Sequence, residues 1–139
     1  MFENILVATD GSEQAEGAED YAIDLAETYD ATIHVLYVVE TKASYIITVD
    51  LKDEELDEYK AYGEETVSAV VDRAAERGVD GVGVVKTGRI PEQIAEYAED
   101  NDIDSIVVGK QGHGALKKYL GGTAEKVANL TDIPLTIVE

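Results

Sequence analysis

The sequence contains no cysteine, which excludes disulfide bonds, thiolate catalysis and cysteine-ligated metal sites. It has only two histidines, and it shows no recognisable pairing of a nucleophile with a base. No apolar run approaches the ~18 residues that cross a bilayer, and the amino-terminal residues lack the cationic start of a signal peptide. From these absences we expect a cytoplasmic protein of a reducing compartment that does not enter a membrane.

Basic residues are scarce in this chain. It has 11 Lys and Arg against 30 Asp and Glu, and its formal charge is −19. This balance argues against nucleic acid and anionic membrane surfaces as partners, because both require a cationic face. The acidic surplus is spread over the whole chain, and such a protein repels itself unless salt screens the charges. We therefore expect a halophilic protein, with an acidic protein of ordinary salt as the alternative.

A length of 139 residues with 45% hydrophobic side chains suits one domain. No repeat, low-complexity segment or Pro- or Gly-rich linker divides the chain, so residues 1–139 are predicted to form a single domain. Five short apolar runs, several of them rich in β-branched residues, predict buried strands. They lie at 4–9, 31–39, 82–86, 105–108 and 135–138.

Between these runs, apolar residues recur every three to four positions, which is the spacing of amphipathic helices. Strands that alternate with helices and are apolar throughout indicate a parallel sheet covered on both faces. The predicted fold class is therefore α/β, a single doubly wound, Rossmann-like five-stranded parallel sheet. The helices are predicted over about 15–29 and 53–77, from Pro91 onward, and over 123–130.

Two loops carry the residues that look functional. In an open doubly wound sheet, ligands bind beyond the carboxyl ends of the strands, where the strand order reverses. The segment Thr9–Ser12 follows the first strand, and Gly109–Gly114 follows the fourth. If these strands are neighbours, the two loops face each other.

The glycine-rich stretch from Gly109 to Gly122 is the most informative part of the sequence. Its glycines allow a backbone to approach a ligand closely. Gly122 and Thr123 are predicted to open the last helix, whose free N–H groups would form a seat for a phosphate. An anion is also favoured by four of the chain's eleven basic residues, the lysines at 110, 117, 118 and 126.

The pattern Gly109-x2-Gly112-x9-Gly122-Thr123 resembles the G-x2-G-x9-G-(S/T) signature of ATP-binding universal stress proteins. Segments 6–12, 124–127 and 133–138 are also similar to that family, and the resemblance covers the whole chain. It implies a sheet of order 3-2-1-4-5, a homodimer, and a nucleotide-dependent stress or signalling module with at most slow ATP hydrolysis. It further implies bound ATP, with AMP or ADP as other ligands, and Mg²⁺ or Mn²⁺ held mainly by phosphates and water.

The same resemblance implies which residues bind the nucleotide. Ala8, Thr9 and Asp10 would line the nucleoside pocket. Val38 would meet the adenine through its backbone, and Gly109 would lie by the ribose. The residues around the phosphates would be Gly112, His113, Gly122, Thr123 and Ala124.

Simpler roles remain open for single residues. Asp10 could cap the first helix instead of lining a pocket, and His113 could face solvent. His34, within a strand pattern, is predicted to be a packed or edge side chain. The last strand, 135–138, would be an exposed sheet edge in a monomer, and pairing it across a two-fold axis predicts a homodimer.

Rival functions also remain. One is a dimeric scaffold of the same family that has lost ATP, and another is a small ATP-hydrolysing enzyme. A phosphorelay receiver is disfavoured because Lys86-Thr87-Gly88 stands where that domain needs an aspartate after its third strand. No Gly-x4-Gly-Lys-(Ser/Thr) motif is present, so a P-loop nucleotidase is disfavoured as well. The sequence does not identify a protein partner.

Overall fold

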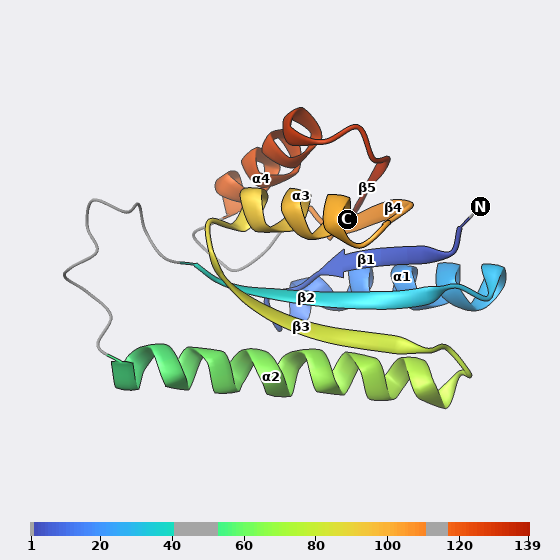
Figure 1. Cartoon of the computed structure of the whole chain (residues 1–139), viewed down its shortest axis with the longest axis horizontal. Helices are drawn as coiled ribbons and strands as arrows, with labels where there is room; N and C mark the ends of the chain where they lie inside the picture. Colours follow the sequence, from blue (N-terminus) through green and yellow to red (C-terminus); the bar gives the residue numbers. More distant parts are fainter. Residues whose placement is uncertain (1, 41–52, 111–116) are drawn as a thin grey trace.

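The computed structural model describes residues 2–40, 53–110 and 117–139, and for residues 53 and 117–121 it describes the backbone alone. Gly112, His113 and most of the irregular connection over 40–50 lie outside the described residues. Five parallel strands form one sheet of order β3-β2-β1-β4-β5, which confirms the predicted fold class and strand order (Figure 1). The strands are β1 (Asn4–Ala8), β2 (Thr32–Glu40), β3 (Gly81–Gly88), β4 (Ser105–Gly109) and β5 (Leu135–Val138).

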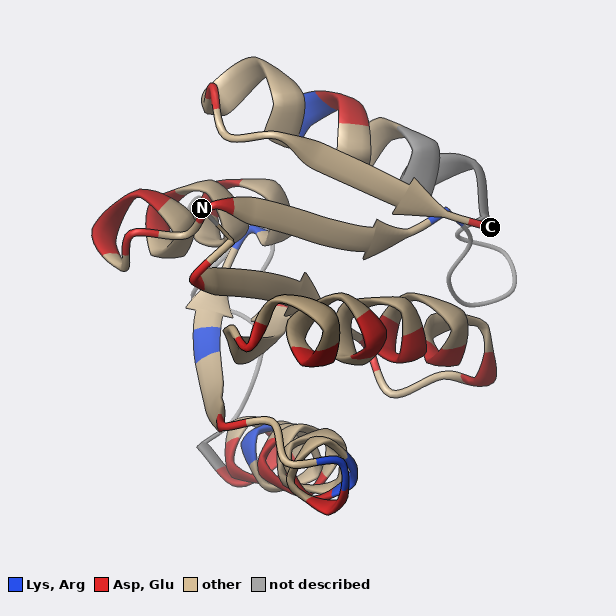
Figure 2. Cartoon of the chain, turned by 90° about the vertical axis from the view of Figure 1, so that its right-hand side faces the viewer, with Lys and Arg blue, Asp and Glu red and all other residues tan. Residues whose placement is uncertain are grey.

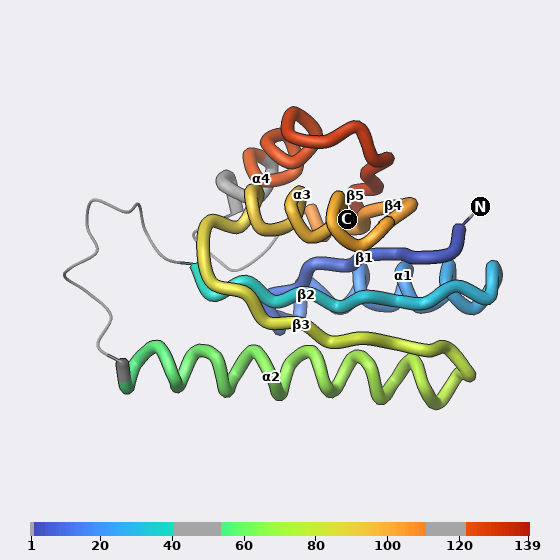
Figure 3. Tube along the Cα trace, viewed as in Figure 1, coloured from blue at the N-terminus to red at the C-terminus, as the bar shows by residue number. Residues whose placement is uncertain are grey.

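Helices cover both faces of the sheet. Helices α1 and α2 pack on one face and α3 and α4 on the other, and α2 runs along β2 and β3 (Figure 3). A short 3-10 helix, η1, comes before α1. The bounds are η1 (Glu13–Ala15), α1 (Glu16–Tyr29), α2 (Asp53–Glu76), α3 (Ile90–Asp100) and α4 (Lys117–Leu130).

The central strands are apolar throughout because both of their faces are buried. In β1, Ile5 and Val7 point to the face covered by α1 and α2, while Leu6 points to the face covered by α3 and α4. All three side chains are inaccessible to solvent. Burial of such a side chain stabilises the fold by roughly 1.5–3 kcal/mol, so β1 anchors the two halves of the core to each other.

Charge lies mainly on the helices. Figure 2 shows Asp and Glu along the helices, whereas the strands are almost entirely uncharged in that view. Gly78 follows α2 with a left-handed backbone (φ 76°), as expected for a glycine at the end of a helix. None of the helices in the described residues has the length and apolar character that a membrane crossing needs.

The predicted start of the last helix is wrong. Helix α4 begins at Lys117, so Gly122 and Thr123 lie inside it and do not open it. A glycine costs about 1 kcal/mol in a helix interior, which weakens a helix that has already formed. The glycine does not force a new helix to begin, because each further residue adds a hydrogen bond to the helix that is already formed. The phosphate seat predicted from a helix start at Gly122 is therefore not present in that form.

Candidate functional site

The carboxyl ends of β1, β2 and β4 lie at the same end of the sheet. The prediction that the first and fourth strands are neighbours is confirmed, since Ile5, Leu6 and Val7 are in register with residues 105–107. The strand order reverses between them. The loop after β1 and the residues that end β4 therefore lie at the switch point of the sheet, where doubly wound proteins bind ligands.

Strand β2 runs past the end of β1 (Figure 1). The N–H of Thr9 donates a hydrogen bond to the Leu36 carbonyl over 3.0 Å, so the backbone groups of Leu36 point toward β1. Backbone groups alternate sides along a strand. The N–H and C=O of Val38, two residues further on, therefore point to the same side, beyond the end of β1.

Gly109 lies at the corresponding place on the other side of β1. The N–H of Lys110 donates to the Val138 carbonyl of β5 over 2.7 Å, so by alternation the backbone groups of Gly109 face the β1 side. The register between β4 and β1 ends at Val107. We call Thr9, Asp10, Val38 and Gly109 the switch-point site, because the last two present backbone groups to the end of β1 from opposite sides.

The loop after β1 is organised by its own side chains. The Asp10 carboxylate accepts hydrogen bonds from the Ser12 N–H at 2.9 Å and from the Ser12 hydroxyl at 2.5 Å. Ser12 is the residue that precedes η1. Asp10 thus stabilises the turn before the helix and does not itself cap a helix, although its exposed carboxylate remains at the site.

The other predicted residues differ in their surroundings. Ala8 and Val38 are half-buried against the core beneath α3 and α4, and Ala124 is part of that core with 3% of its surface exposed. Ala124 can therefore offer a ligand only its backbone. Gly122 and Thr123 are half-buried on α4. The Lys110 ammonium lies 3.2 Å from the Glu139 carboxylate.

A buried carboxylate beside the site was not singled out from the sequence. Glu19 on α1 is 4% exposed, and its Oε2 accepts a hydrogen bond from the Thr9 hydroxyl at 2.5 Å. Its Oε1 accepts from Arg73 Nη1 at 3.0 Å, and Arg73 Nη2 donates to Asp20 at 2.6 Å. Burial opposes the charge on Arg73, but the hydrogen bonds that Arg73 donates to Glu19 and Asp20 outweigh this effect and raise the pKa of the guanidinium. The only signal in the sequence was an acid next to Ala18 on the inward face of the helix.

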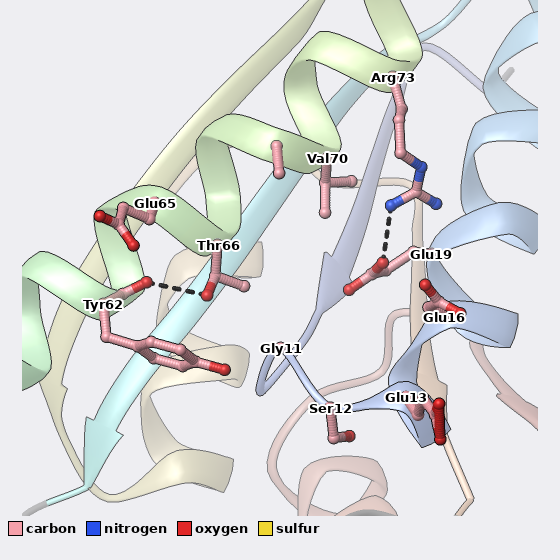
Figure 4. Close-up of a pocket in the computed structure, with 11 residues that line it drawn as sticks. Gly11, Ser12, Glu13, Glu16, Glu19, Tyr62, Glu65, Thr66, Val70 and Arg73 are labelled. Atoms are coloured by element: carbon pink, nitrogen blue, oxygen red, sulfur yellow. Dashed lines mark hydrogen bonds and ion pairs between the residues drawn. The ribbon is translucent and has the colours of Figure 1, made fainter.

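A cavity of about 330 Å³ lies behind the loop, between α1 and α2 (Figure 4). Its wall includes Gly11, Glu16, Glu19, Tyr62 and Arg73. It belongs to the sheet face covered by α1 and α2, opposite to the face of the Ala8 and Val38 side chains. Within the described part of the chain, no three His, Asp or Glu side chains are grouped so that they could hold a metal ion.

Comparison with known proteins gives a consistent result. The chain matches the universal stress protein family over residues 1–139. It is 32% identical over 147 aligned residues to the universal stress protein YxiE of Bacillus subtilis, covering 99% of both chains. Among solved structures, it matches the universal stress protein UspA from Lactobacillus plantarum with a TM-score of 0.85 and 24% identity, over 99% of this chain and 98% of that one.

Two further solved structures contain an adenine nucleotide. One is a universal stress protein in complex with cAMP, with a TM-score of 0.75 and 22% identity over 99% of this chain and 97% of the other. The second is the universal stress protein from Archaeoglobus fulgidus in complex with dAMP, with a TM-score of 0.71 and 24% identity over the whole of both chains. At these identities the two structures establish likeness of fold. The match over the full length and the close relative show that the chain belongs to the universal stress protein family.

Proposed function

We propose that this chain binds an adenine nucleotide at the switch-point site and acts as a nucleotide-dependent stress or signalling module in the cytoplasm. ATP is the proposed ligand, with ADP and AMP as further ligands. The observation that carries this proposal is the convergence of backbone groups from Val38 and Gly109 on the end of β1. Backbone N–H and C=O groups suit an adenine and a ribose, which present both donors and acceptors. The relatives solved with cAMP and dAMP support the same ligand class.

The phosphates would extend toward α4. Among the described residues, no atom lies within 4 Å of a Cβ atom added to Gly122. Packing therefore does not explain a glycine at this position, whereas close approach of a ligand to the backbone would. Gly112, His113, Thr123 and Ala124 complete the proposed phosphate-binding set. A Mg²⁺ or Mn²⁺ ion accompanying the nucleotide would take most of its ligands from phosphates and water.

The test is the substitution Gly122→Val, with ATP binding measured by calorimetry in molar KCl. The branched side chain should weaken ATP binding at least tenfold. It should leave the free energy of unfolding unchanged or slightly higher, because valine has a better helix propensity than glycine and its Cβ would contact no atom of the residues that the structure describes. A Gly122→Val protein that binds ATP as tightly as the parent would contradict the proposed path of the phosphates. A parent protein that binds neither ATP nor AMP would contradict the proposed function.

A homodimer through β5 is the second part of the proposal. This strand is a sheet edge, and Ile137 on it is 49% exposed. Pairing of two edges would cover it. Light scattering in high salt should give about twice the monomer mass of 15.0 kDa. A dimer that ignores ATP would instead favour the scaffold function, and steady turnover of ATP would favour the enzyme.

A further inference from the structure

Glu19 joins two helices to the loop of the switch-point site. It is a nearly fully buried carboxylate on α1, and it contacts Arg73 of α2 on one side and Thr9 at the end of β1 on the other. Figure 4 shows the Arg73 side chain reaching from α2 to Glu19, above the loop that contains Gly11. Thr9 and Glu19 are ten residues apart in the sequence, whereas Arg73 is 54 residues from Glu19, so the placement of both α1 and α2 on the same face of the sheet brings the three together.

The directions of these hydrogen bonds are determined by the groups involved. Both Glu19 oxygens act as acceptors, one for the Arg73 guanidinium and one for the Thr9 hydroxyl. Because the Thr9 hydroxyl uses its single proton on Glu19, its lone pairs are free to accept the Gly11 N–H, which lies 3.1 Å away. By accepting the hydrogen bond from Thr9, Glu19 orients the hydroxyl that holds the Gly11 amide.

The same loop also rests directly on α2. Gly11 has a left-handed backbone (φ 78°), and a Cβ atom there would lie 2.7 Å from the Tyr62 hydroxyl and 3.0 Å from the Thr66 hydroxyl. The loop thus approaches α2 as closely as a backbone without a side chain allows. Its position depends on α2 through this contact and through the chain Arg73–Glu19–Thr9.

We propose that Glu19 is a positioning residue for nucleotide binding, which couples the docking of α2 to the loop at 9–12 through the Thr9 hydroxyl. The effect on nucleotide binding rests on the proposed function, whereas the coupling between α2 and the loop does not. Such coupling is reciprocal: a nucleotide that is bound better by the ordered loop also stabilises the docked position of α2. Nucleotide binding would then affect the position of α2, a helix on which the Tyr59 and Tyr62 side chains are exposed to solvent.

The substitution Glu19→Gln tests this directly. A glutamine offers one acceptor oxygen and one NH₂ group, so either Arg73 or Thr9 faces a donor in place of an acceptor. The matched control is Glu16→Gln, one turn earlier on α1. Glu16 lines the same cavity and is exposed. Both variants remove one negative charge from the same region, which by itself should slightly favour an anionic ligand. A loss of affinity in Glu19→Gln alone therefore cannot come from charge.

Two readouts are needed. The first is the amide resonance and hydrogen-exchange rate of Gly11 in the protein without nucleotide. The second is the dissociation constant for ATP by calorimetry in molar KCl. We expect Glu19→Gln to shift the Gly11 resonance, to speed its exchange at least tenfold and to weaken ATP binding at least fivefold. Glu16→Gln should do none of these.

If the two glutamine variants behave alike in both readouts, the proposed role of Glu19 is wrong. If the Gly11 amide responds to Glu19→Gln but the parent binds no ATP, the coupling to the loop is supported and the proposed function is refuted. If Glu19→Gln does not fold, Thr9→Val and Thr9→Ser replace it. The valine variant should reproduce the Gly11 and ATP effects, and the serine variant, which keeps the hydroxyl, should resemble the parent. Equal behaviour of these two variants would overturn the proposal.

Discussion

The Tyr97 hydroxyl lies 2.6 Å from Nδ1 of His34, and this contact joins α3 to strand β2 of the sheet. On the other side of the ring, Nε2 lies 3.0 Å from the Asn4 side-chain oxygen. The Asn4 amide nitrogen donates to the Asp102 carbonyl, which turns the oxygen of Asn4 toward His34. A neutral imidazole with its proton on Nε2 satisfies both contacts, since Nε2 then donates to the Asn4 oxygen and Nδ1 accepts from the Tyr97 hydroxyl. The prediction that His34 is a packed side chain is confirmed, because it is 8% exposed.

This arrangement predicts a dependence of stability on pH. Burial lowers the pKa of His34 below its ordinary value of 6.5, so the unfolded chain binds a proton more readily than the folded protein does. The contribution of the neutral imidazole is therefore complete above pH 6.5 and declines as the pH falls toward the pKa of the folded state. Nuclear magnetic resonance titration of the His34 ring should give a midpoint below 6.5, with a His113→Gln variant used to assign the two imidazole signals. A midpoint at or above 6.5 would contradict the structure.

A companion variant, Tyr97→Phe, removes the donor to Nδ1 and leaves the ring otherwise in place. Loss of this buried hydrogen bond should lower the free energy of unfolding by about 1–2 kcal/mol at pH 7.5. It should also weaken the preference for the neutral ring, because the Tyr97 hydroxyl favours that form by donating to it. Urea denaturation at pH 7.5 and the same ring titration measure the two effects. An unchanged unfolding curve would show that the contact contributes nothing.

The two arginines of the interface between α1 and α2 should differ in importance. Arg73 contacts the buried Glu19, whereas Arg77 contacts Asp24 and Glu27, which are exposed. Arg73→Gln should cost about 1–3 kcal/mol, because it leaves a buried carboxylate without its charged donor. Arg77→Gln should be close to neutral in molar KCl, since salt screens exposed pairs. Paired urea denaturation curves check this, and equal effects of the two substitutions would contradict it.

Replacing Gly63 by alanine should destabilise the protein, although alanine is normally preferred in a helix. A Cβ atom at Gly63 would lie 2.6 Å from Cδ1 of the Tyr37 ring. That ring also packs edge-on against Tyr62, with centroids 5.8 Å apart. Moving it should cost about 1–3 kcal/mol, which exceeds the gain of ~1 kcal/mol in helix propensity. At Gly122 an added methyl contacts no atom of the described part of the chain. Gly122→Ala should therefore stabilise the fold, so opposite signs for the two variants are expected.

The charge of −19 predicts that folding requires salt. At ~1 M salt the Debye length is about 3 Å, and most repulsion between surface carboxylates is screened. Circular dichroism during a KCl titration should show helical signal rising with salt. A fold that is equally stable from roughly 0.05 to 3 M KCl would rule out the halophilic interpretation and leave an acidic protein of ordinary salt.

The local pattern was sufficient to predict every strand and α-helix that the structure describes, although not the short helix η1, because period and β-branching act over a few neighbouring residues. It also placed the loop after β1 and Gly109 at the same end of the sheet. The bounds were less accurate. Strand β3 extends to Gly88, where the turn was expected, since it remains paired with β2 as far as Glu40. Helix α4 begins at Lys117 because helix propagation tolerates a glycine pair.

The sequence by itself determined the alternation of apolar strands and amphipathic helices, and with it a parallel sheet whose loops meet at one end. The tertiary structure alone decided the partners of the buried polar groups. Glu19 contacts Arg73 and Thr9. His34 contacts Tyr97 and Asn4. None of these pairs could be predicted from the spacing of residues within one helix or strand. A hydrophobic side chain can pack against any apolar neighbour, so the spacing of apolar residues along the sequence is enough to predict which side chains are buried. A buried polar atom needs one donor or acceptor in one direction, and that partner exists only once the chain has folded.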